Sequence, residues 1–240
     1  MKKTLSLILI IALSFISVFL FTACQKDTEF IFDIIDGKKE YRIVSVKTAK
    51  KDISIPSKYN NLPVTEIGKE AFAGEQKIVS IYIPDSIVII GDKAFYDCRN
   101  LENLRLPQNL ENIPNEMTVN TSIKNINIPN NVKRIEYRAF CTSQIKDLNI
   151  PNSVEYIGYE AFYASTIETI TIGNNIQEIQ PFAFQYCNNL KSVKFTNPDN
   201  IYLYGVTFKD GFLENPENVP FYFLDEQYAC RHWFAKQKTN

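Results

Sequence analysis

The residue types that most often carry catalysis or bind metals are scarce in this sequence. Its 240 residues include one histidine, His232, and five cysteines. Cys230 and His232 are two residues apart, which places their side chains on different sides of a helix. A zinc site needs two further ligands and a cysteine nucleophile needs a base, and neither set occurs at suitable spacing. We therefore predict a non-enzymatic protein with no catalytic residues, no metal site and no cofactor.

Cys24 stands in a setting that suggests a different chemistry. Two lysines near the N-terminus precede residues 4–21, which carry no charge and are rich in Leu, Ile and Phe. A basic start, an apolar core and small residues predict a secretory signal peptide over residues 1–23. Thr22-Ala23-Cys24 resembles a bacterial lipobox, with Phe21 in place of the usual Leu. This resemblance implies that Cys24 receives a lipid and anchors an exported protein in the cell envelope. The alternative is an uncleaved membrane-spanning segment.

The charge balance excludes some partners. The formal net charge is −1, and removal of Lys2 and Lys3 with a signal peptide changes 26 − 27 to 24 − 27, or −3. Nucleic-acid-binding proteins need a basic surface, so we predict no nucleic-acid partner. The eight glycines are spread too thinly to form a phosphate-binding loop.

An internal repeat is the strongest pattern in the chain. Six similar segments close at positions 84, 107, 129, 151, 173 and 196, which are 23, 22, 22, 22 and 23 residues apart. Ala-Phe pairs with the same period end at Phe72, Phe95, Phe140, Phe162 and Phe184, and we assign Met117 to the gap in this series. Such a period predicts a solenoid of stacked coils in which no coil is stable alone.

Each coil contains an apolar pair two residues apart, which is typical of a strand with one buried face. We expect these strands to form a parallel sheet over residues 53–208, with Pro and Asn turning the chain after each strand. The buried phenylalanines should form a shared interior column.

The repeat resembles a known family. The pattern Ile-x-x-Ile-x-Ile-Pro-x-x-Val-x-x-Ile-Gly-x-x-Ala-Phe is similar to the BspA-like leucine-rich repeat, also called the Treponema pallidum type. Residues 145–162 match it at nearly every position, and the resemblance covers about two thirds of the chain. It departs from the pattern at Met117 and at Pro114, Glu136 and Gln180, which replace Gly. The resemblance implies a leucine-rich-repeat solenoid and the surface location and adhesive role for which the family is known.

Both ends of a solenoid expose apolar core and need caps. Residues 24–52 contain apolar runs at 30–35 and 41–46 around Asp36-Gly37, which predicts a β-hairpin as the N-terminal cap. Residues 209–240 should form the C-terminal cap. Within them, the apolar spacing over residues 225–238 predicts a helix.

The predicted stacking also bears on the remaining cysteines. Cys98 and Cys187 are four coils apart, or about 19 Å at the usual strand spacing, whereas a disulfide needs Cα atoms within about 7 Å. Cys141 is two coils from each of them, so we predict free and mostly buried thiols. Pairing of Cys187 with Cys230 remains open.

Outward positions of the strands form two columns, which we take as the candidate binding face. The first column is Ser80, Asn103, Asn125, Asp147, Thr169 and Ser192. The second column is Tyr82, Arg105, Asn127, Asn149, Thr171 and Lys194. Short polar side chains on a regular sheet suit hydrogen bonding to a glycan or an extended protein, although any solvated sheet has polar outward positions.

Tyrosines form a second candidate surface. Tyr137 and Tyr159 occupy the same position in adjacent coils, near Tyr156 and Tyr163. Tyrosine is enriched in interfaces, but these residues could also brace the turns of the solenoid. From the whole sequence we expect an envelope lipoprotein that binds a host or neighbouring-cell protein or glycan, with adhesion as its role. The alternative is a structural spacer of the envelope without a soluble ligand.

Overall fold

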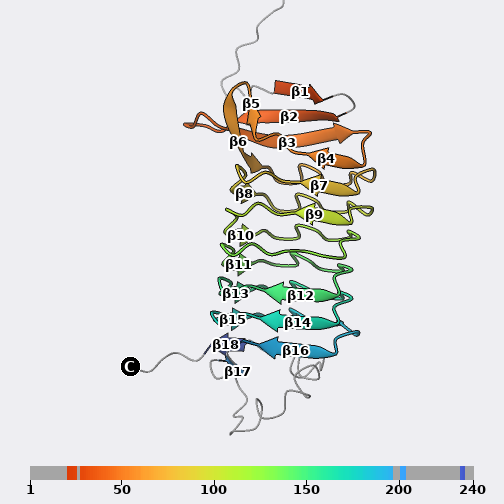
Figure 1. The fold of residues 1–240 in the computed structure, drawn as a ribbon, viewed down its shortest axis with the longest axis vertical. Coiled ribbons are helices and arrows are strands. Elements are labelled where there is room, and N and C mark those ends of the chain that lie inside the picture. The colour runs from red at the N-terminus through yellow and green to blue at the C-terminus, as the bar shows by residue number, and fades with distance from the viewer. Residues whose placement is uncertain (1–20, 26–27, 197–200, 204–232, 236–240) are drawn as a thin grey trace, which may run out of the picture.

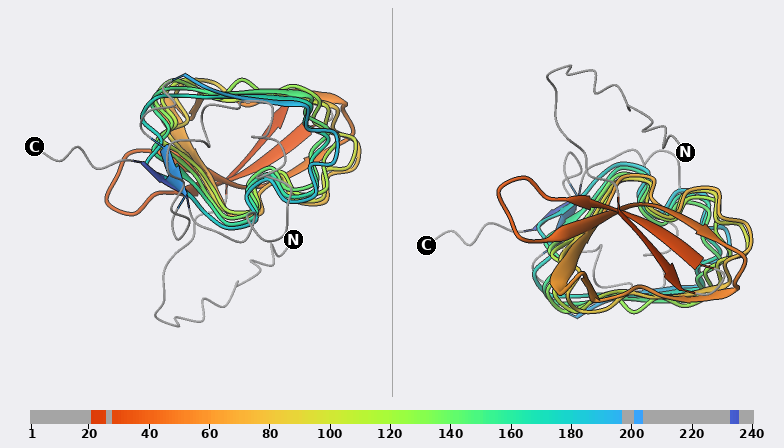
Figure 2. Two further views of the ribbon diagram at one scale, coloured as in Figure 1. Left: turned by 90° about the horizontal axis from the view of Figure 1, so that it is seen from below. Right: turned by 90° about the horizontal axis from the view of Figure 1, so that it is seen from above.

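The computed structural model describes residues 21–25, 28–196, 201–203 and 233–235, which form a β-solenoid (Figure 1). Viewed along the axis, the successive coils follow nearly the same outline (Figure 2). Residues 1–20 of the predicted signal peptide and most of the predicted cap at 209–240 lie outside the described residues. Within the described part, no helix is long and apolar enough to cross a membrane.

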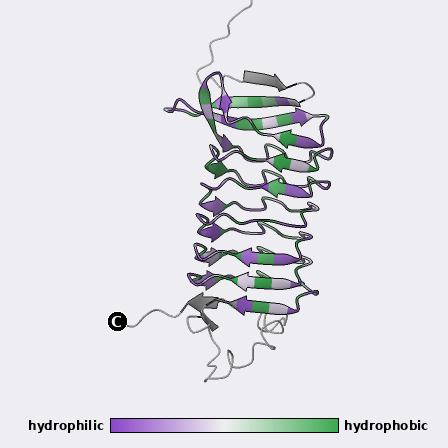
Figure 3. Ribbon diagram, viewed as in Figure 1, coloured by the Kyte–Doolittle hydropathy of each residue, from purple (hydrophilic) through white to green (hydrophobic). Residues whose placement is uncertain are grey.

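One side of the coils, the long face, carries parallel strands with the register that the repeat predicts. The strands are β4 (Asp52–Ser54), β7 (Ser80–Tyr82), β9 (Asn103–Arg105), β12 (Asp147–Ile150), β14 (Thr169–Ile172) and β16 (Ser192–Phe195). They form two three-stranded sheets, and an isolated bridge from Asn103 to Asn125 extends the first of them. Inward residues such as Ile81, Leu148 and Ile170 are buried, and Figure 3 shows the resulting alternation of apolar and polar positions.

A second side, the short face, carries strands that are mostly two residues long. They are β6 (Leu62–Ile67), β8 (Ile89–Ile90), β10 (Asn112–Ile113), β11 (Arg134–Ile135), β13 (Tyr156–Ile157) and β15 (Glu178–Ile179). β6 pairs with β8, and β10, β11, β13 and β15 pair in that order, all in parallel. Gly91 follows β8 where a Cβ atom would lie 2.4 Å from the backbone nitrogen of Lys69, so glycine allows close stacking there.

The third side is a corner in which two residues per coil have positive φ, four positions apart. The pairs are Glu70 and Gly74, Lys93 and Asp97, Glu116 and Asn120, Arg138 and Thr142, Glu160 and Ala164, and Phe182 and Tyr186. The left-handed conformation costs a non-glycine residue roughly 1–2 kcal/mol. Hydrogen bonds between coils offset this cost, as in the 2.8 Å bond from the Thr142 N–H to the Tyr163 carbonyl.

The phenylalanine column exists, but the sequence assigned one coil of it to the wrong residue. The ring pairs Phe72–Phe95 and Phe162–Phe184 have centroids 5.3 and 5.2 Å apart. The φ periodicity and the bond from the Thr118 N–H to the Ala139 carbonyl place Thr118 in the column. Met117 therefore takes the alanine position. In this coil a large side chain, Met117, precedes a small one, Thr118, whereas in the other coils a small alanine precedes a large phenylalanine. Both residues are completely buried, and the Thr118 hydroxyl donates to the Ala139 carbonyl at 3.0 Å.

A column of small hydrogen-bond donors lies three residues after the phenylalanine position. Its members are Cys98, Thr121, Ser143, Ser165 and Cys187, and all five are buried. The Cys98 thiol donates to the Phe72 carbonyl at 2.9 Å, and the Ser165 hydroxyl donates to the Phe140 carbonyl at 3.1 Å. A thiol and a hydroxyl thus fill the same role, which explains unpaired cysteines at this position.

The N-terminal cap is the predicted hairpin, made by β2 (Thr28–Ile34) and β3 (Tyr41–Thr48). Its strands cross the end of the coils (Figure 2) and bury Phe30 and Phe32 in a core that continues to Val193. β3 pairs in parallel with β6, while β5 (Lys58–Tyr59) pairs antiparallel with β6. A strand that the sequence did not indicate, β1 (Phe21–Gln25), lies antiparallel to the outer edge of β2.

At the other end, the predicted helix over residues 225–238 is wrong in its described part. Residues 233–235 form β18 (Trp233–Ala235), which pairs antiparallel with β15 and with β17 (Ile201–Leu203). The last strand of a stack leaves backbone N–H and C=O groups without partners, and an added strand satisfies them where a helix would not. The spacing of apolar residues in the sequence does not show that the last strand has unpaired backbone groups. The rest of the predicted helix lies outside the described residues.

Candidate ligand-binding face

The structure aligns the residues of both predicted columns within each sheet of the long face. Ser80 pairs with Asn103, and Tyr82 pairs with Arg105. Further along, the register joins Asp147, Thr169 and Ser192 of the first column and Asn149, Thr171 and Lys194 of the second column. Asn125 and Asn127 lie between the two sheets and are exposed, as are most members of both columns. The coils stay in register there because the Gln144 N–H donates to the Ile123 carbonyl at 3.0 Å.

Tyr82 and Arg105 form the most structured part of the second column. The guanidinium carbon of Arg105 lies 4.7 Å from the centroid of the Tyr82 ring. Arg105 also donates to both carboxylate oxygens of Asp85, at 3.1 and 3.2 Å. The backbone N–H of Gln108 and then the Arg105 guanidinium hold the pKa of Asp85 below its usual value. This group links two adjacent coils, and it leaves 47% of Tyr82 exposed to solvent.

Charged side chains form a row beside the first column, which the sequence analysis did not identify as part of the face. The row contains Glu102, Lys124, Lys146, Glu168 and Lys191. The ammonium group of Lys124 lies 3.0 Å from Glu102, and those of Lys191 and Lys146 lie 2.6 and 3.7 Å from Glu168. The hydrogen bond from Lys191 lowers the pKa of Glu168. In the sequence, a charged residue directly follows the first buried Ile or Leu of each of these repeats, and this pattern could have revealed the row.

This row borders a shallow, open depression of about 490 Å³. Its lining residues are Lys124, Gln144, Lys146, Thr166, Glu168, Asn189 and Lys191. The lining offers both donors and acceptors, in keeping with a polar ligand, but it holds no enclosed cavity. Within the described residues, no group of three or more His, Cys, Asp or Glu side chains could hold a metal ion.

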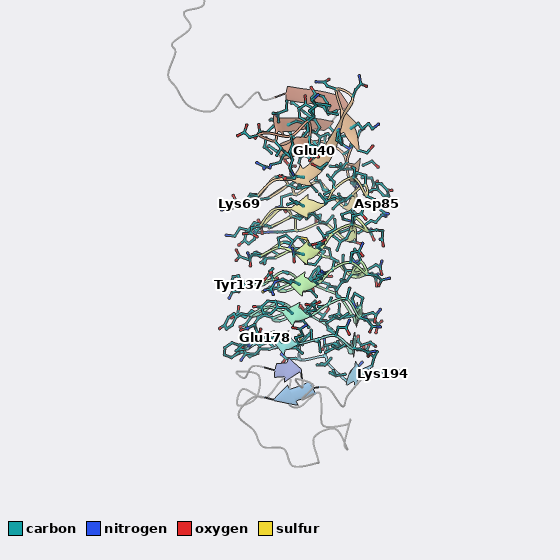
Figure 4. The ribbon with its side chains drawn as sticks, turned by 90° about the vertical axis from the view of Figure 1, so that its left-hand side faces the viewer. Glu40, Lys69, Asp85, Tyr137, Glu178 and Lys194 are labelled. Atoms are coloured by element: carbon teal, nitrogen blue, oxygen red, sulfur yellow. The ribbon has the colours of Figure 1, made fainter. Side chains whose placement is uncertain are left out.

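The tyrosines form a separate surface at the corner, on coils near the C-terminal end. We call Tyr137, Tyr159, Tyr163, Phe182 and Tyr186 the aromatic corner. The rings of Tyr137 and Tyr159 stack with centroids 6.1 Å apart, and Phe182 packs edge-on against Tyr159 at 5.3 Å. Tyr163 and Tyr186 pack edge-on at 5.2 Å. Figure 4 shows Tyr137 and Lys69 at one edge of the molecule, and Asp85 and Lys194 of the long face at the other.

The three cysteines inside the solenoid offer no reactive thiol. Cys98, Cys141 and Cys187 are free and buried, as predicted. Burial raises the pKa of Cys98 and of Cys187 to about 12, and that of Cys141 to about 11. These thiols are therefore protonated at neutral pH and are poor nucleophiles. Cys230 and His232 lie outside the described residues.

Comparisons with known proteins agree with the architecture. The family profile for the BspA type leucine rich repeat region matches residues 47–118, 65–191 and 111–214, with six copies. A search of curated proteins gave no match.

Among solved structures, a leucine rich repeat protein of T. pallidum is 24% identical, with a TM-score of 0.66 over 69% of this chain and 78% of that one. A leucine-rich repeat protein from Bacteroides ovatus ATCC 8483 is 23% identical, with a TM-score of 0.60 over 72% and 53%. A leucine rich cell surface protein from Faecalibacterium prausnitzii A2-165 is 20% identical, with a TM-score of 0.55 over 75% and 56%. The chain thus spans only about half of the last two proteins, and these similarities concern the fold.

Proposed function

The chain belongs to the BspA-type leucine-rich-repeat family, and from this premise we propose that it is an exported envelope lipoprotein whose long face binds a protein or glycan. The proposal assigns it no catalytic activity. The observation that carries it is the register of the long face, which repeats the same outward positions from coil to coil. A ligand with its own repeat, such as a glycan chain or an extended peptide, can contact several coils at once, so weak single contacts add up.

The side chains on this face suit such a ligand. Asn127 and Asn149 each offer two N–H donors and an acceptor, and Thr171 offers a hydroxyl. All three belong to the same column as Tyr82, and the row of charges runs along the other side of the first column, so polar, charged and aromatic side chains occur on one face. This mixture supports binding of a neutral or weakly charged ligand more than binding of a strongly charged polymer.

The proposed anchor is consistent with the position of Cys24. Cys24 pairs with Glu29 across β1 and β2, at the N-terminal end of the solenoid axis (Figure 1). A lipid attached there would hold the cap at the membrane and leave the coils projecting away from it. Cleavage before Cys24 would remove three residues of β1 and keep Cys24 and Gln25.

Display on the cell surface and a role in adhesion complete the proposal. Support comes from the family resemblance and from one similar structure that is described as a cell surface protein. Protease treatment of intact cells tests the location: we expect the protein to be degraded. Survival of the protein in intact cells, with degradation after lysis, would contradict surface display.

A spacer role is the second candidate, and one observation favours it. Many outward side chains of the long face bind each other, as in the 2.6 Å hydrogen bond from the Thr169 hydroxyl to Asp147. Such contacts stiffen the stack and leave fewer groups for a ligand. The two candidates differ in whether the purified protein binds anything through this face.

The experiment measures binding of the whole chain to arrays of glycans and of extracellular matrix proteins. We expect a hit whose affinity falls at least tenfold in Asn127→Ala/Asn149→Ala. Lys133→Ala, on the exposed short face, is the matched control and should bind like the wild type. Absence of binding across the panel would favour the spacer, and equal loss in both variants would contradict a role for the long face.

Lipid anchoring has its own test. We expect Cys24→Ser to release the protein from the membrane fraction and to abolish metabolic labelling with a radioactive fatty acid. Unchanged membrane retention of Cys24→Ser, without labelling of the wild type, would support the uncleaved membrane segment instead.

A further inference from the structure

An open hollow lies at the carboxyl ends of β12, β14 and β16, the ends to which their arrows point in Figure 1. We call it the end hollow. Its volume of about 440 Å³ is within the roughly 300–1,000 Å³ of small-molecule sites. Its polar side chains are Asn130, Asn149, Asn152, Ser153 and Thr196, and no charged residue is among the described residues that line it. It is separate from the depression beside the row of charges, which lies where these strands begin.

An earlier coil of the solenoid has the same corner backbone. Asp85 and Asn152 occupy equivalent positions, each directly after the proline that follows a long strand. The Gln108 N–H donates to Oδ1 of Asp85 at 2.9 Å, and the Asn174 N–H donates to Oδ1 of Asn152 at 3.0 Å. The two corners can therefore be compared directly, and the difference between them comes from the side chains around them.

Arg105 covers the earlier corner. Its guanidinium donates to the Ile83 carbonyl at 2.7 Å and to both carboxylate oxygens of Asp85. Pro107 has no N–H to offer the Ile83 carbonyl, so the arginine supplies the donor. This corner is thus satisfied by side chains of the protein itself.

The later corner is left open. Thr171 takes the place of Arg105, and Gly173 takes the place of Pro107. The Gly173 N–H donates to the Ile150 carbonyl at 2.9 Å, so that no side-chain donor is required. The short Thr171 side chain cannot reach across the corner as arginine does. The end hollow is therefore a particular feature of these coils and not a general feature of the repeat.

The polar groups of the end hollow are available to a ligand. The side-chain amides of Asn130 and Asn149 are exposed and make no hydrogen bond within the described residues. Asn152 accepts the backbone bond with Oδ1, which leaves its two N–H donors for a ligand. The buried Ser153 hydroxyl has no partner in the described part of the chain, but the same holds for Ser86 in the covered corner. The open amides, and not this hydroxyl, distinguish the end hollow.

From these observations we propose that the end hollow is a binding site for a neutral glycan. This inference rests on the proposed function, because it names the class of ligand for the same face. Sugar hydroxyl groups both donate and accept hydrogen bonds, and each asparagine amide offers two donors and an acceptor. The hollow reaches four successive coils, from Asn130 to Thr196, or about 14 Å at the usual strand spacing. It can therefore contact several sugar units of one chain.

Other classes of ligand fit the end hollow less well. Without a charged side chain in its described lining, the hollow offers no counter-ion to an acidic glycan or to a charged peptide. Its apolar members Ile150 and Pro151 are buried, so an apolar peptide side chain finds no exposed pocket. β14 is paired on both sides, by β12 and β16, so an extended peptide cannot add a strand there.

The test measures binding of the whole chain to an array of short neutral oligosaccharides, built from glucose, galactose, mannose and N-acetylhexosamines, together with acidic glycans. Calorimetric titration with the best neutral oligosaccharide then gives the affinity. Thr171→Arg/Asn152→Asp copies the covering arginine and aspartate of the earlier corner into the end hollow and leaves the net charge unchanged. We expect its affinity to fall at least about tenfold. Circular dichroism and the midpoint of thermal unfolding verify that the fold is retained.

Val88→Arg/Ile89→Asp is the matched control. It introduces the same two residue types on the exposed short face, where other coils carry Lys133 and Glu178 at these positions. This variant should bind like the wild type. Asn130→Ala is a second hollow variant, and it should also weaken binding. Because Asn130 belongs to neither column of the long face, its effect tests the end hollow apart from the proposed function.

Equal affinity for the neutral oligosaccharide in the wild type and in both hollow variants would overturn the inference. So would the lack of any neutral ligand on the array. If an acidic glycan or a matrix protein bound in that case, the proposed function would stand without the inference. Absence of binding across the whole panel would count against both.

Discussion

The rings of Phe140 and Phe162 lie stacked in the interior of the solenoid, with centroids 5.4 Å apart and planes 13° apart. They are 22 residues apart in the chain, and both are completely buried. This contact joins two coils that have little apolar surface to bury alone. The stability of the array should therefore depend strongly on the column to which they belong.

Phe162→Ala should lower the free energy of unfolding by about 3–5 kcal/mol, because it leaves a cavity between Phe140 and Phe184. Urea unfolding followed by circular dichroism measures this. Phe182→Ala is the control, and it should cost much less because Phe182 is only half-buried. Similar losses in the two variants would show that the interior column is not the main source of stability.

Met117 and Thr118 should be energetically coupled. Thr118→Phe alone adds a ring beside Met117 and should cost about 1–3 kcal/mol. Met117→Ala alone should cost about 2–5 kcal/mol through a cavity. The double variant restores the Ala-Phe order of the other coils, so its cost should be smaller than the sum by about 0.5–3 kcal/mol. Urea unfolding of all four proteins gives the coupling, and additive costs would contradict the assignment of Thr118 to the column.

Asp85 should stabilise the fold only above acidic pH. Its pKa is lowered in the folded state, so its contribution is present above the ordinary value of 3.8 and is lost as pH falls through the lower folded pKa. Asp85→Asn should therefore unfold at a lower temperature than wild type at pH 7. The difference should shrink toward pH 2. Thermal unfolding measured across this range checks the sign, and a difference that grows on acidification would refute it.

Cys98 and Cys187 should resist alkylation in the folded protein. Burial raises the pKa of both thiols from 9.0 to about 12, so iodoacetamide at pH 8 should modify them only after unfolding. Peptide mapping by mass spectrometry identifies the modified sites. Their contribution to stability is present below pH 9 and decreases as pH rises from 9 toward 12, because the unfolded thiols lose protons first. Rapid labelling of Cys98 without unfolding would contradict this burial.

Periodicity allowed much of the fold and the candidate face to be predicted. A strand has a period of two, so Ile81, Leu104 and Leu148 identified the inward side and, with it, the outward positions Tyr82, Arg105 and Asn149. The spacing of 22 or 23 residues then fixed which of them align. The same reasoning separated Cys98 from Cys187 and predicted free thiols.

Contacts between coils and at the ends were not accessible in this way. The assignment of Met117 to the phenylalanine column failed because apolar character alone does not distinguish adjacent buried positions, whereas φ and hydrogen bonding do. Among the left-handed corner residues Gly74 is a glycine and the others are not, so glycine does not reveal this corner in the sequence. Hydrogen bonds to the next coil stabilise the non-glycine residues there. The helix expected near Trp233 followed local spacing, while the unpaired edge of β15 favours a strand.

The amino-acid sequence by itself determined the repeat, the inward and outward positions of each strand and the separation of the cysteines. These features depend on a short residue pattern that recurs at a fixed interval along the solenoid axis. Only the tertiary structure decided that Thr118 replaces a phenylalanine, that β18 covers β15, and that Arg138 and Glu160 lie among stacked tyrosines. Each of these depends on which groups a neighbouring coil leaves unpaired or uncovered, and that is a property of the assembled stack.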